Sequence, residues 1–323
     1  MKRWILIALV AAFALFLPFI FKDDYYRYLF VMIGINIILV SSLDILVGYT
    51  GSISMAHAAF WGVGAYGSAL LAIHYHVGLI GGLFVSIFVS MIFGILIGYP
   101  SLRLKGHYFV IVTFIFGIII EILFRNLVQI TRGPMGLPGI PPARLEIPGL
   151  LKIVFSSTLS YYYLVLVFVF IILILKVRLI HSKMGRALIS IREDEILAES
   201  VGVNTAFYKV LTFAISSSFA GIAGTLYSHF ISFIGPETFS FFKSFELFVM
   251  NLVGGKATLV GPILGSCALI LLEEWAKIFS PAIARVVYGI ILILFIIYMP
   301  LGIAGLISKL KTKVMGKRGH EIT

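Results

Sequence analysis

"LVGYTGSISMAHAAFWGVGAYGSALL", residues 46–71, joins an irregular, partly polar start to an apolar helix-forming run. From Ala58 onward, small residues recur at spacings of four, three, four and three, which places them on one helix face. In lipid, such a face lets a second helix backbone approach closely. The glycines and serines of residues 48–57 suit a helix poorly, and irregular backbone at membrane depth is tolerated only where protein or water surrounds it. The sequence therefore predicts a broken helix near 48–57 that leads into a tightly packed helix.

Two interpretations of the break at 48–57 remain open. It is either an interfacial loop between two helices or a segment that faces a path across the membrane. A lone histidine such as His57 is more often a hydrogen-bonded structural residue than a ligand. The candidates for a pathway role are Gly48, Gly51, Ser52, Ser54 and His57.

The composition of the whole chain is that of an integral membrane protein. Of its 323 residues, 60% are hydrophobic and 12% are charged. The apolar residues form runs of about 20, the length of a helix that crosses a bilayer. We expect an all-α, polytopic protein, since a β-barrel would show shorter strands of alternating polarity. About ten transmembrane helices are predicted, near residues 4–21, 28–47, 56–74, 78–98, 107–125, 158–176, 207–230, 245–262, 263–280 and 283–300.

Lysine and arginine residues indicate which side of the membrane each loop occupies. If the spans alternate, the basic segments 101–107, 176–209 and 309–323 fall on the same side as the N-terminal Lys-Arg pair. We therefore expect an N-in, C-in topology. Residues 1–308 would form a single transmembrane domain, with a coupling loop at 176–209, and residues 309–323 a basic cytoplasmic tail. The net charge of +11 is explained by this loop asymmetry, so no nucleic-acid partner is predicted.

The sequence lacks the usual patterns of catalytic, nucleotide and metal sites. It has no GxxxxGK[ST] phosphate loop, no HExxH pair and a single cysteine, Cys267. We therefore predict no catalytic residue, no metal and no cofactor in this chain. An ion-coupled secondary amino acid transporter is an alternative, and it would need an acidic residue near the midplane. Glu121 is the nearest candidate, but Arg125 one turn later favours an ion pair.

The polar segment that follows residue 182 predicts a helix, a sharp turn and a second helix. Gly202 can end the first helix, and Asn204 can cap the second. The first helix could lie on the membrane surface, but its acidic run at 193–195 would be repelled by anionic headgroups. Docking into a groove of another protein suits these charges better. One face of the predicted helix over 186–200 carries Leu188, Ile191, Glu195 and Ala198.

Two short segments, "LVGYTG" (46–51) and "LVGGKA" (252–257), echo one another. Each is expected at the cytoplasmic end of a span. Such an echo is the kind of signal that internal repeats leave in transporters, although six residues are little evidence of a duplication.

Four ordered blocks of the sequence resemble one protein family. They are "GYTGSISMAHAAFWGVGAYGSALL" (48–71), "GRALISIREDEILAESVGVNTAFYKVLTFAISSSFAGIAGTLYS" (185–228), "GPETFSFFKSFELFVMNLVGGKATLVGPILG" (235–265) and "MPLGIAGL" (299–306). The chain resembles the permease subunits of prokaryotic branched-chain amino acid ABC importers, and among them the longer, M-type member of the permease pair. It departs from the family at Lys256–Ala257, where a small residue followed by glycine is usual. Permeases for urea and short-chain amides share the superfamily, so such a substrate is an alternative.

The resemblance implies a transport subunit for branched-chain or other hydrophobic amino acids in the prokaryotic cytoplasmic (inner) membrane. Its implied partners are membrane lipid, a second homologous permease, two ATP-binding subunits that hold ATP and Mg, and an extracytoplasmic substrate-binding protein. Residues 185–202 would then be a coupling helix that docks on an ATP-binding subunit, with candidate residues Gly185, Arg186, Leu188, Ile191, Arg192, Glu195, Ala198 and Gly202. Candidates for close helix packing are Ala58, Gly62, Ala65, Ser217, Gly221 and Gly224.

Overall fold

A computed structural model describes residues 14–101, 106–147, 151–277, 289–290, 293 and 302–306. The first span, predicted at 4–21, and the last, at 283–300, fall mostly outside the described residues. The basic tail predicted at 309–323 falls wholly outside them.

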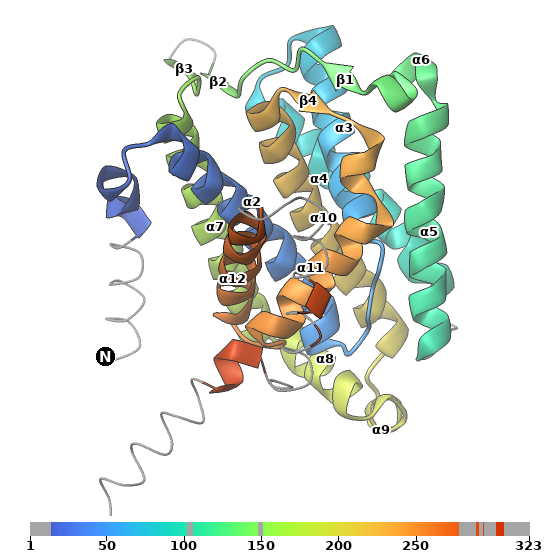
Figure 1. The fold of residues 1–323 in the computed structure, drawn as a ribbon. Helices are drawn as coiled ribbons and strands as arrows, with labels where there is room; N and C mark the ends of the chain where they lie inside the picture. Colours follow the sequence, from blue (N-terminus) through green and yellow to red (C-terminus); the bar gives the residue numbers. More distant parts are fainter. Residues whose placement is uncertain are drawn as a thin grey trace, which may run out of the picture.

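Within the described part of the chain, five helices are long and apolar enough to cross a membrane. Their most apolar 18-residue windows have mean hydropathies of 1.4 to 2.8, and each helix lies over a predicted span. This confirms the class of an all-α, polytopic membrane protein (Figure 1). The helices are α2 (Asp24–Tyr49), α4 (Leu79–Ser101), α5 (His107–Asn126), α7 (Thr158–His181) and α10 (Thr205–Ile231).

Helices α2 and α10 form the centre of the bundle. Their apolar windows are 89% and 78% buried inside the chain, against 28% for each of α4, α5 and α7. Helix α10 packs against α2, α4 and the glycine-rich helix α3 (His57–Tyr75). The outer helices therefore keep apolar faces free for lipid or for a second membrane protein.

The predicted break of the helix near 48–57 is confirmed as a feature of the backbone. Helix α2 ends at Tyr49, residues 50–56 are not helical, and α3 begins at His57. The imidazole of His57 contacts Ser216, which lies eleven residues into α10. At 1.5 Å per residue, this is about 16 Å from the start of α10. Residues 50–56, here called the break segment, thus lead from the exposed Gly51 to the buried residues 54–56, and α3 begins at depth.

Helix α11 (Phe241–Gly254) also begins inside the bundle, beside the start of α3. The Ser244 hydroxyl, in the first turn of α11, accepts a hydrogen bond from Ala58 N at 2.9 Å. At its other end, α11 leads into the turn 255–260, where Ala257 N lies against Asp44 of α2. Helix α3 therefore runs toward one end of the bundle and α11 toward the other.

The spans predicted at 245–262 and 263–280 are wrong in their boundaries. Helix α11 has 14 residues and ends at Gly254, and α12 (Gly261–Ala276) has 16. Gly255 has a φ of 109°, a conformation that side chains rarely adopt, so the helix ends there. Fourteen residues span about 21 Å, less than the roughly 30 Å of bilayer hydrocarbon. The predicted span 245–262 runs through this turn and into the start of α12, because most residues of the turn are small or apolar.

Short ribbons and turns cover the end of the bundle toward which α3 runs, here called the ribbon end (Figure 1). Two antiparallel pairs lie there, β1 with β4 and β2 with β3. Strands of two to four residues do not change the all-α class. The elements are α6 (Val128–Thr131), η1 (Gly133–Met135), β1 (Leu137–Pro138), β2 (Arg144–Ile147), β3 (Leu151–Val154), β4 (Phe233–Ile234) and η2 (Pro236–Phe239).

Helices α8 (Lys183–Glu193) and α9 (Glu195–Ser200) lie at the opposite end, here called the α8–α9 end (Figure 1). The single helix predicted over 186–200 is therefore wrong, because the chain breaks at Asp194. The Asp194 carboxylate accepts hydrogen bonds from Ile196 N and Leu197 N and so caps α9. Helix α7 also continues to His181, past the predicted loop boundary at 176.

Candidate functional site

His57 joins the start of α3 to two other helices. Its Nε2 lies 3.0 Å from Ser216 Oγ, and Ser216 donates its own hydroxyl proton to Ser42 O of α2. His57 Nε2 therefore carries the proton and donates to Ser216. The ring is fully buried, and Nδ1 has no hydrogen-bond partner in the described structure. This arrangement supports a structural role for His57 at the break.

The break segment is held by a side chain of α5 and by one of its own side chains. Met55 N donates to Thr113 Oγ1 of α5 at 3.1 Å, and Ala56 N donates to Ser54 Oγ at 3.3 Å. Ser54 is fully buried, whereas Gly51 is exposed. These bonds satisfy amide groups that would otherwise be unpaired in a low-dielectric interior. A non-helical segment can therefore persist at this depth.

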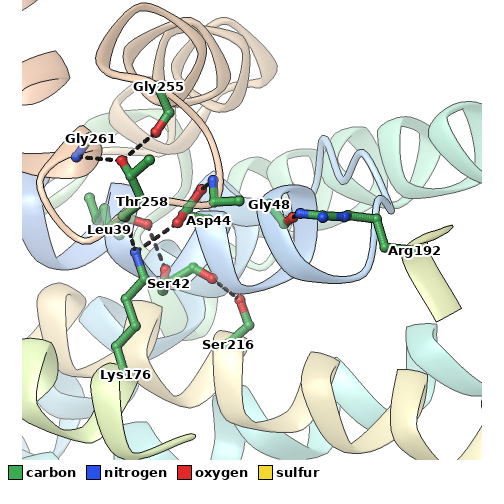
Figure 2. Close-up of polar contacts among 11 residues, drawn as sticks. Leu39, Ser42, Asp44, Gly48, Lys176, Arg192, Ser216, Gly255, Thr258 and Gly261 are labelled. Atoms are coloured by element: carbon green, nitrogen blue, oxygen red, sulfur yellow. Dashed lines mark hydrogen bonds and ion pairs between the residues drawn. The ribbon is translucent and has the colours of Figure 1, made fainter. Parts of the chain in front are cut away.

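A buried ion pair joins α2, α7 and the turn 255–260 (Figure 2). Lys176 Nζ lies 2.7 Å from Asp44 Oδ2, and both side chains are 0% exposed. The same Nζ donates to Thr258 O at 3.1 Å, and Asp44 Oδ1 accepts from Ala257 N at 2.8 Å. Both charges are therefore paired and also hydrogen-bonded, as buried charges must be.

Sequence reasoning missed this ion pair. Asp44 lies near the end of the predicted span 28–47, and Lys176 lies at the start of the predicted coupling loop 176–209. The available signal was two opposite charges at the same expected side of the membrane, each beside an apolar run. Apolar periodicity does not show which helices are neighbours, so the pairing was not predictable from it.

The turn 255–260 approaches the end of α2 closely at Gly48. A Cβ added at Gly48 would lie 2.6 Å from Ala257 N and 2.5 Å from Asp44 Oδ1. Ala257 has a φ of 58°, a conformation that favours glycine. The turn is thus tight despite the departure from the family pattern at Lys256–Ala257. It also brings the two echoing segments, 46–51 and 252–257, into contact.

Arg192 of α8 links the α8–α9 end directly to α2 (Figure 2). Its guanidinium donates to Gly48 O at 2.9 Å and pairs with Glu193 at 2.6 Å. The Arg192 Cγ lies 3.3 Å from the position of a Cβ at Gly51. One side chain thus touches both the last turn of α2 and the first residues after it. Arg192, a predicted coupling residue, therefore contacts Gly48 and Gly51, which are predicted pathway residues.

The α8–α9 segment turns part of its predicted coupling face toward the bundle. Leu188, Ile191 and Ala198 are 0%, 4% and 2% exposed. Gly185 is buried, Arg186 and Gly202 are exposed, and Glu195 pairs with Lys209 of α10 at 2.5 Å. The predicted turn is confirmed, because Gly202 has a φ of 87° and Asn204 Oδ1 accepts from Phe207 N. The apolar side chains that α9 and its end expose are Ile196 (71%), Leu197 (63%) and Val201 (73%).

The six predicted packing residues are all buried, and the glycines among them make close contacts with other elements. A Cβ at Gly224 would meet Trp61 O and lie 2.6 Å from Ala65 N, and one at Gly221 would lie 2.6 Å from Ser86 O. Gly62 of α3 lies against Phe124 and Phe239, and Ala58 and Ser217 are buried. These contacts are between helices of this chain. Small residues thus bring α3, α4 and α10 together, as expected for helices in lipid.

The described residues contain no group of three His, Cys, Asp or Glu side chains placed to hold a metal ion. A helix break inside a membrane bundle, with a buried ion pair beside it, is typical of membrane transport proteins.

Comparison with known proteins identifies the family. Residues 25–296 match the model of the branched-chain amino acid transport system / permease component. The chain belongs to this family, and within it to the M-type permeases. Permease components are transport subunits of ABC importers, so the chain is not itself an enzyme. No solved structure matches the chain.

Named relatives agree with this assignment. The high-affinity branched-chain amino acid transport system permease proteins LivM of Salmonella typhimurium and Escherichia coli are both 32% identical to the chain. The matches cover 84% and 89% of this chain and 68% and 72% of the relatives. LivH of Escherichia coli, a second permease protein of such a system, is 27% identical over 81% of this chain and 90% of its own length. Similarity to both indicates that the chain is one member of a permease pair.

Proposed function

We propose that the chain forms half of the membrane pathway of an ATP-driven importer for branched-chain or other hydrophobic amino acids. A homologous H-type permease would supply the other half. Two ATP-binding subunits would dock at the α8–α9 end, on the cytoplasmic side, and a substrate-binding protein at the ribbon end. The location would be a prokaryotic inner membrane, with about ten transmembrane helices and both termini in the cytoplasm.

The observation that carries this proposal is the Arg192 contact with Gly48 and Gly51. Movement of α8 would pull on the end of α2 and on the break segment, whose other end fixes the start of α3. A short segment at the membrane surface would thereby reposition a helix that begins at depth. Rigid-body motion of this kind is how packed helices switch between two arrangements.

The docking surface would be the exposed apolar side of α9. Ile196, Leu197 and Val201 are largely exposed, while Leu188 and Ile191 pack into the bundle. Apolar side chains ringed by charge are typical of protein interfaces. The predicted coupling segment 185–202 would thus contact the ATP-binding subunit through α9 and transmit its motion through α8.

The function is tested by transport in proteoliposomes. The chain, co-expressed with its neighbouring permease, ATP-binding and substrate-binding subunits, should import leucine in the presence of ATP and not in its absence. Uptake of urea or of a short-chain amide in place of leucine would favour the alternative superfamily substrate. Uptake by the isolated chain, driven by an ion gradient without ATP, would contradict the ABC assignment.

The Ser54→Leu variant tests the pathway role of the break segment. Ser54 is fully buried and accepts from Ala56 N, so a larger apolar side chain should displace the segment. Leucine uptake should fall at least tenfold while the complex still assembles in the membrane. The control is Val167→Phe, because Val167 is 55% exposed on α7 and lies outside both the break segment and the α8–α9 segment. Unchanged uptake by assembled Ser54→Leu complexes would remove the pathway role.

A further inference from the structure

A cavity of about 430 Å³ opens between α5, η2 and the start of α11. Its volume lies within the usual range of small-molecule sites. The lining combines charged and aromatic side chains, with Glu121 and Arg125 from α5, Glu237 from η2, and Phe114 and Phe241 as apolar walls. The two phenylalanine rings meet edge to face with centroids 4.3 Å apart. The lining therefore combines a pair of packed aromatic rings with side chains of both signs of charge.

The charges of the cavity leave one carboxylate unpaired. Arg125 pairs with Glu121 at 3.0 Å, and Glu237 makes no ion pair among the described residues. Glu121 is the more buried partner, with 17% of its side chain exposed against 43% for Arg125. The lining thus has two carboxylates and one guanidinium, so it can accept an ammonium group at the carboxylates while Arg125 binds a carboxylate in a bidentate manner.

The residues that line the cavity lie on elements that lead from the ribbon end toward the helix break. Glu121 lies five residues before the end of α5, about 8 Å from the ribbon end. Phe114, at the inner end, follows Thr113, whose hydroxyl accepts from Met55 N of the break segment. Phe241, on the other wall, begins the helix whose Ser244 accepts from Ala58 N. Each wall therefore lies on a helix that also holds the break, within three residues of the side chain that does so.

We propose that this cavity is a receiving site for the zwitterion of an apolar α-amino acid. The ammonium group lies between Glu121 and Glu237, the carboxylate lies on Arg125, and the side chain packs against Phe114 and Phe241. An amino acid released at the ribbon end is held there before the break moves. The assignment rests on the proposed function, and it names the residues that recognise the substrate.

Direct binding of radiolabelled leucine tests this site. The complete permease–ATPase complex is placed in nanodiscs without nucleotide and without binding protein. Leucine should bind saturably, and Glu121→Gln and Arg125→Gln should each weaken binding at least tenfold. Leucinamide, which lacks the carboxylate, and 4-methylpentanoate, which lacks the ammonium group, should compete at least tenfold less well than leucine.

The matched control is the ion pair between Lys243 and Glu246 on α11. Lys243 Nζ lies 2.6 Å from Glu246 Oε1, and the two side chains are 22% and 23% exposed, much as in the Glu121–Arg125 pair. Neither residue lines the cavity. Glu246→Gln should leave leucine binding within twofold of the unmodified complex. The site would be overturned if the Glu121→Gln and Arg125→Gln complexes bound leucine as tightly as the unmodified complex. It would also be overturned if an unmodified complex that imports leucine with ATP showed no saturable leucine binding. Failure of ATP-driven uptake by the unmodified complex would instead overturn the proposed function.

Discussion

Replacing Lys176 with methionine is expected to destabilise the permease severely. The change leaves the Asp44 carboxylate in the bundle without its cation, at a position where both side chains are 0% exposed. Removal of one partner of a buried pair typically costs about 3–5 kcal/mol, because the remaining charge is uncompensated. The loss is measured as a lower thermal midpoint and a lower yield of folded complex in detergent.

The double variant Asp44→Asn with Lys176→Met separates loss of the charge from loss of packing. It removes both charges, so it should recover most of the stability that the single variant loses. Lys277→Met serves as the exposed control, since the Lys277 and Glu273 side chains are 53% and 47% exposed, and solvent-exposed pairs contribute little. A Lys176→Met complex as stable as the unmodified one would contradict a stabilising role for the Lys176–Asp44 ion pair. A double variant no more stable than the single variant would contradict it as well.

Gly224→Ala is the second change for which we expect a large effect. The added Cβ would meet Trp61 O and lie 2.6 Å from Ala65 N, both of which are backbone atoms of α3. Backbone cannot move aside as a flexible side chain can, so α3 and α10 must separate. Overpacking of this kind costs about 1–3 kcal/mol, and we expect a clear fall in the thermal midpoint of the complex.

Gly67→Ala on α3 is the matched control for this helix contact. Its Cβ would lie 3.8 Å from Val85 Cγ1, an ordinary contact distance. Because alanine is the better helix former by up to about 1 kcal/mol, this variant should be as stable as the unmodified protein or more so. The close α3–α10 contact would be disproved by equal stability of the Gly224→Ala and Gly67→Ala complexes.

The sequence predicted the membrane class and the break because those features have local signals. Hydrophobic runs identify spans, and the glycines and serines of 48–57 disfavour a helix. Glycine at 202 can adopt the backbone conformation of a turn, and the side chain of Asn204 can cap a helix. The structure confirms both predictions. Each of these predictions needs only the residues next to it in the chain.

Two features of the α8–α9 segment were misread, one local and one dependent on distant parts of the chain. Asp194 was counted as one charge of an acidic run, whereas its carboxylate caps α9 and divides the segment in two. Leu188 was placed on an outward docking face, but it packs into the bundle. The amphipathic pattern shows that a helix has an apolar face, and it does not show whether that face is buried within the chain or against a partner.

The Arg192→Gln variant tests most directly whether α8 transmits ATPase motion to the helix break. ATP hydrolysis and leucine uptake are measured together in proteoliposomes, with Lys183→Gln, an exposed change on the same helix, as control. Because Arg192 bonds to Gly48 O within this chain, the variant should retain hydrolysis within twofold of the unmodified complex while uptake falls at least tenfold. Uptake per ATP equal to that of the unmodified complex, or hydrolysis that falls in parallel with uptake, would contradict transmission through this contact.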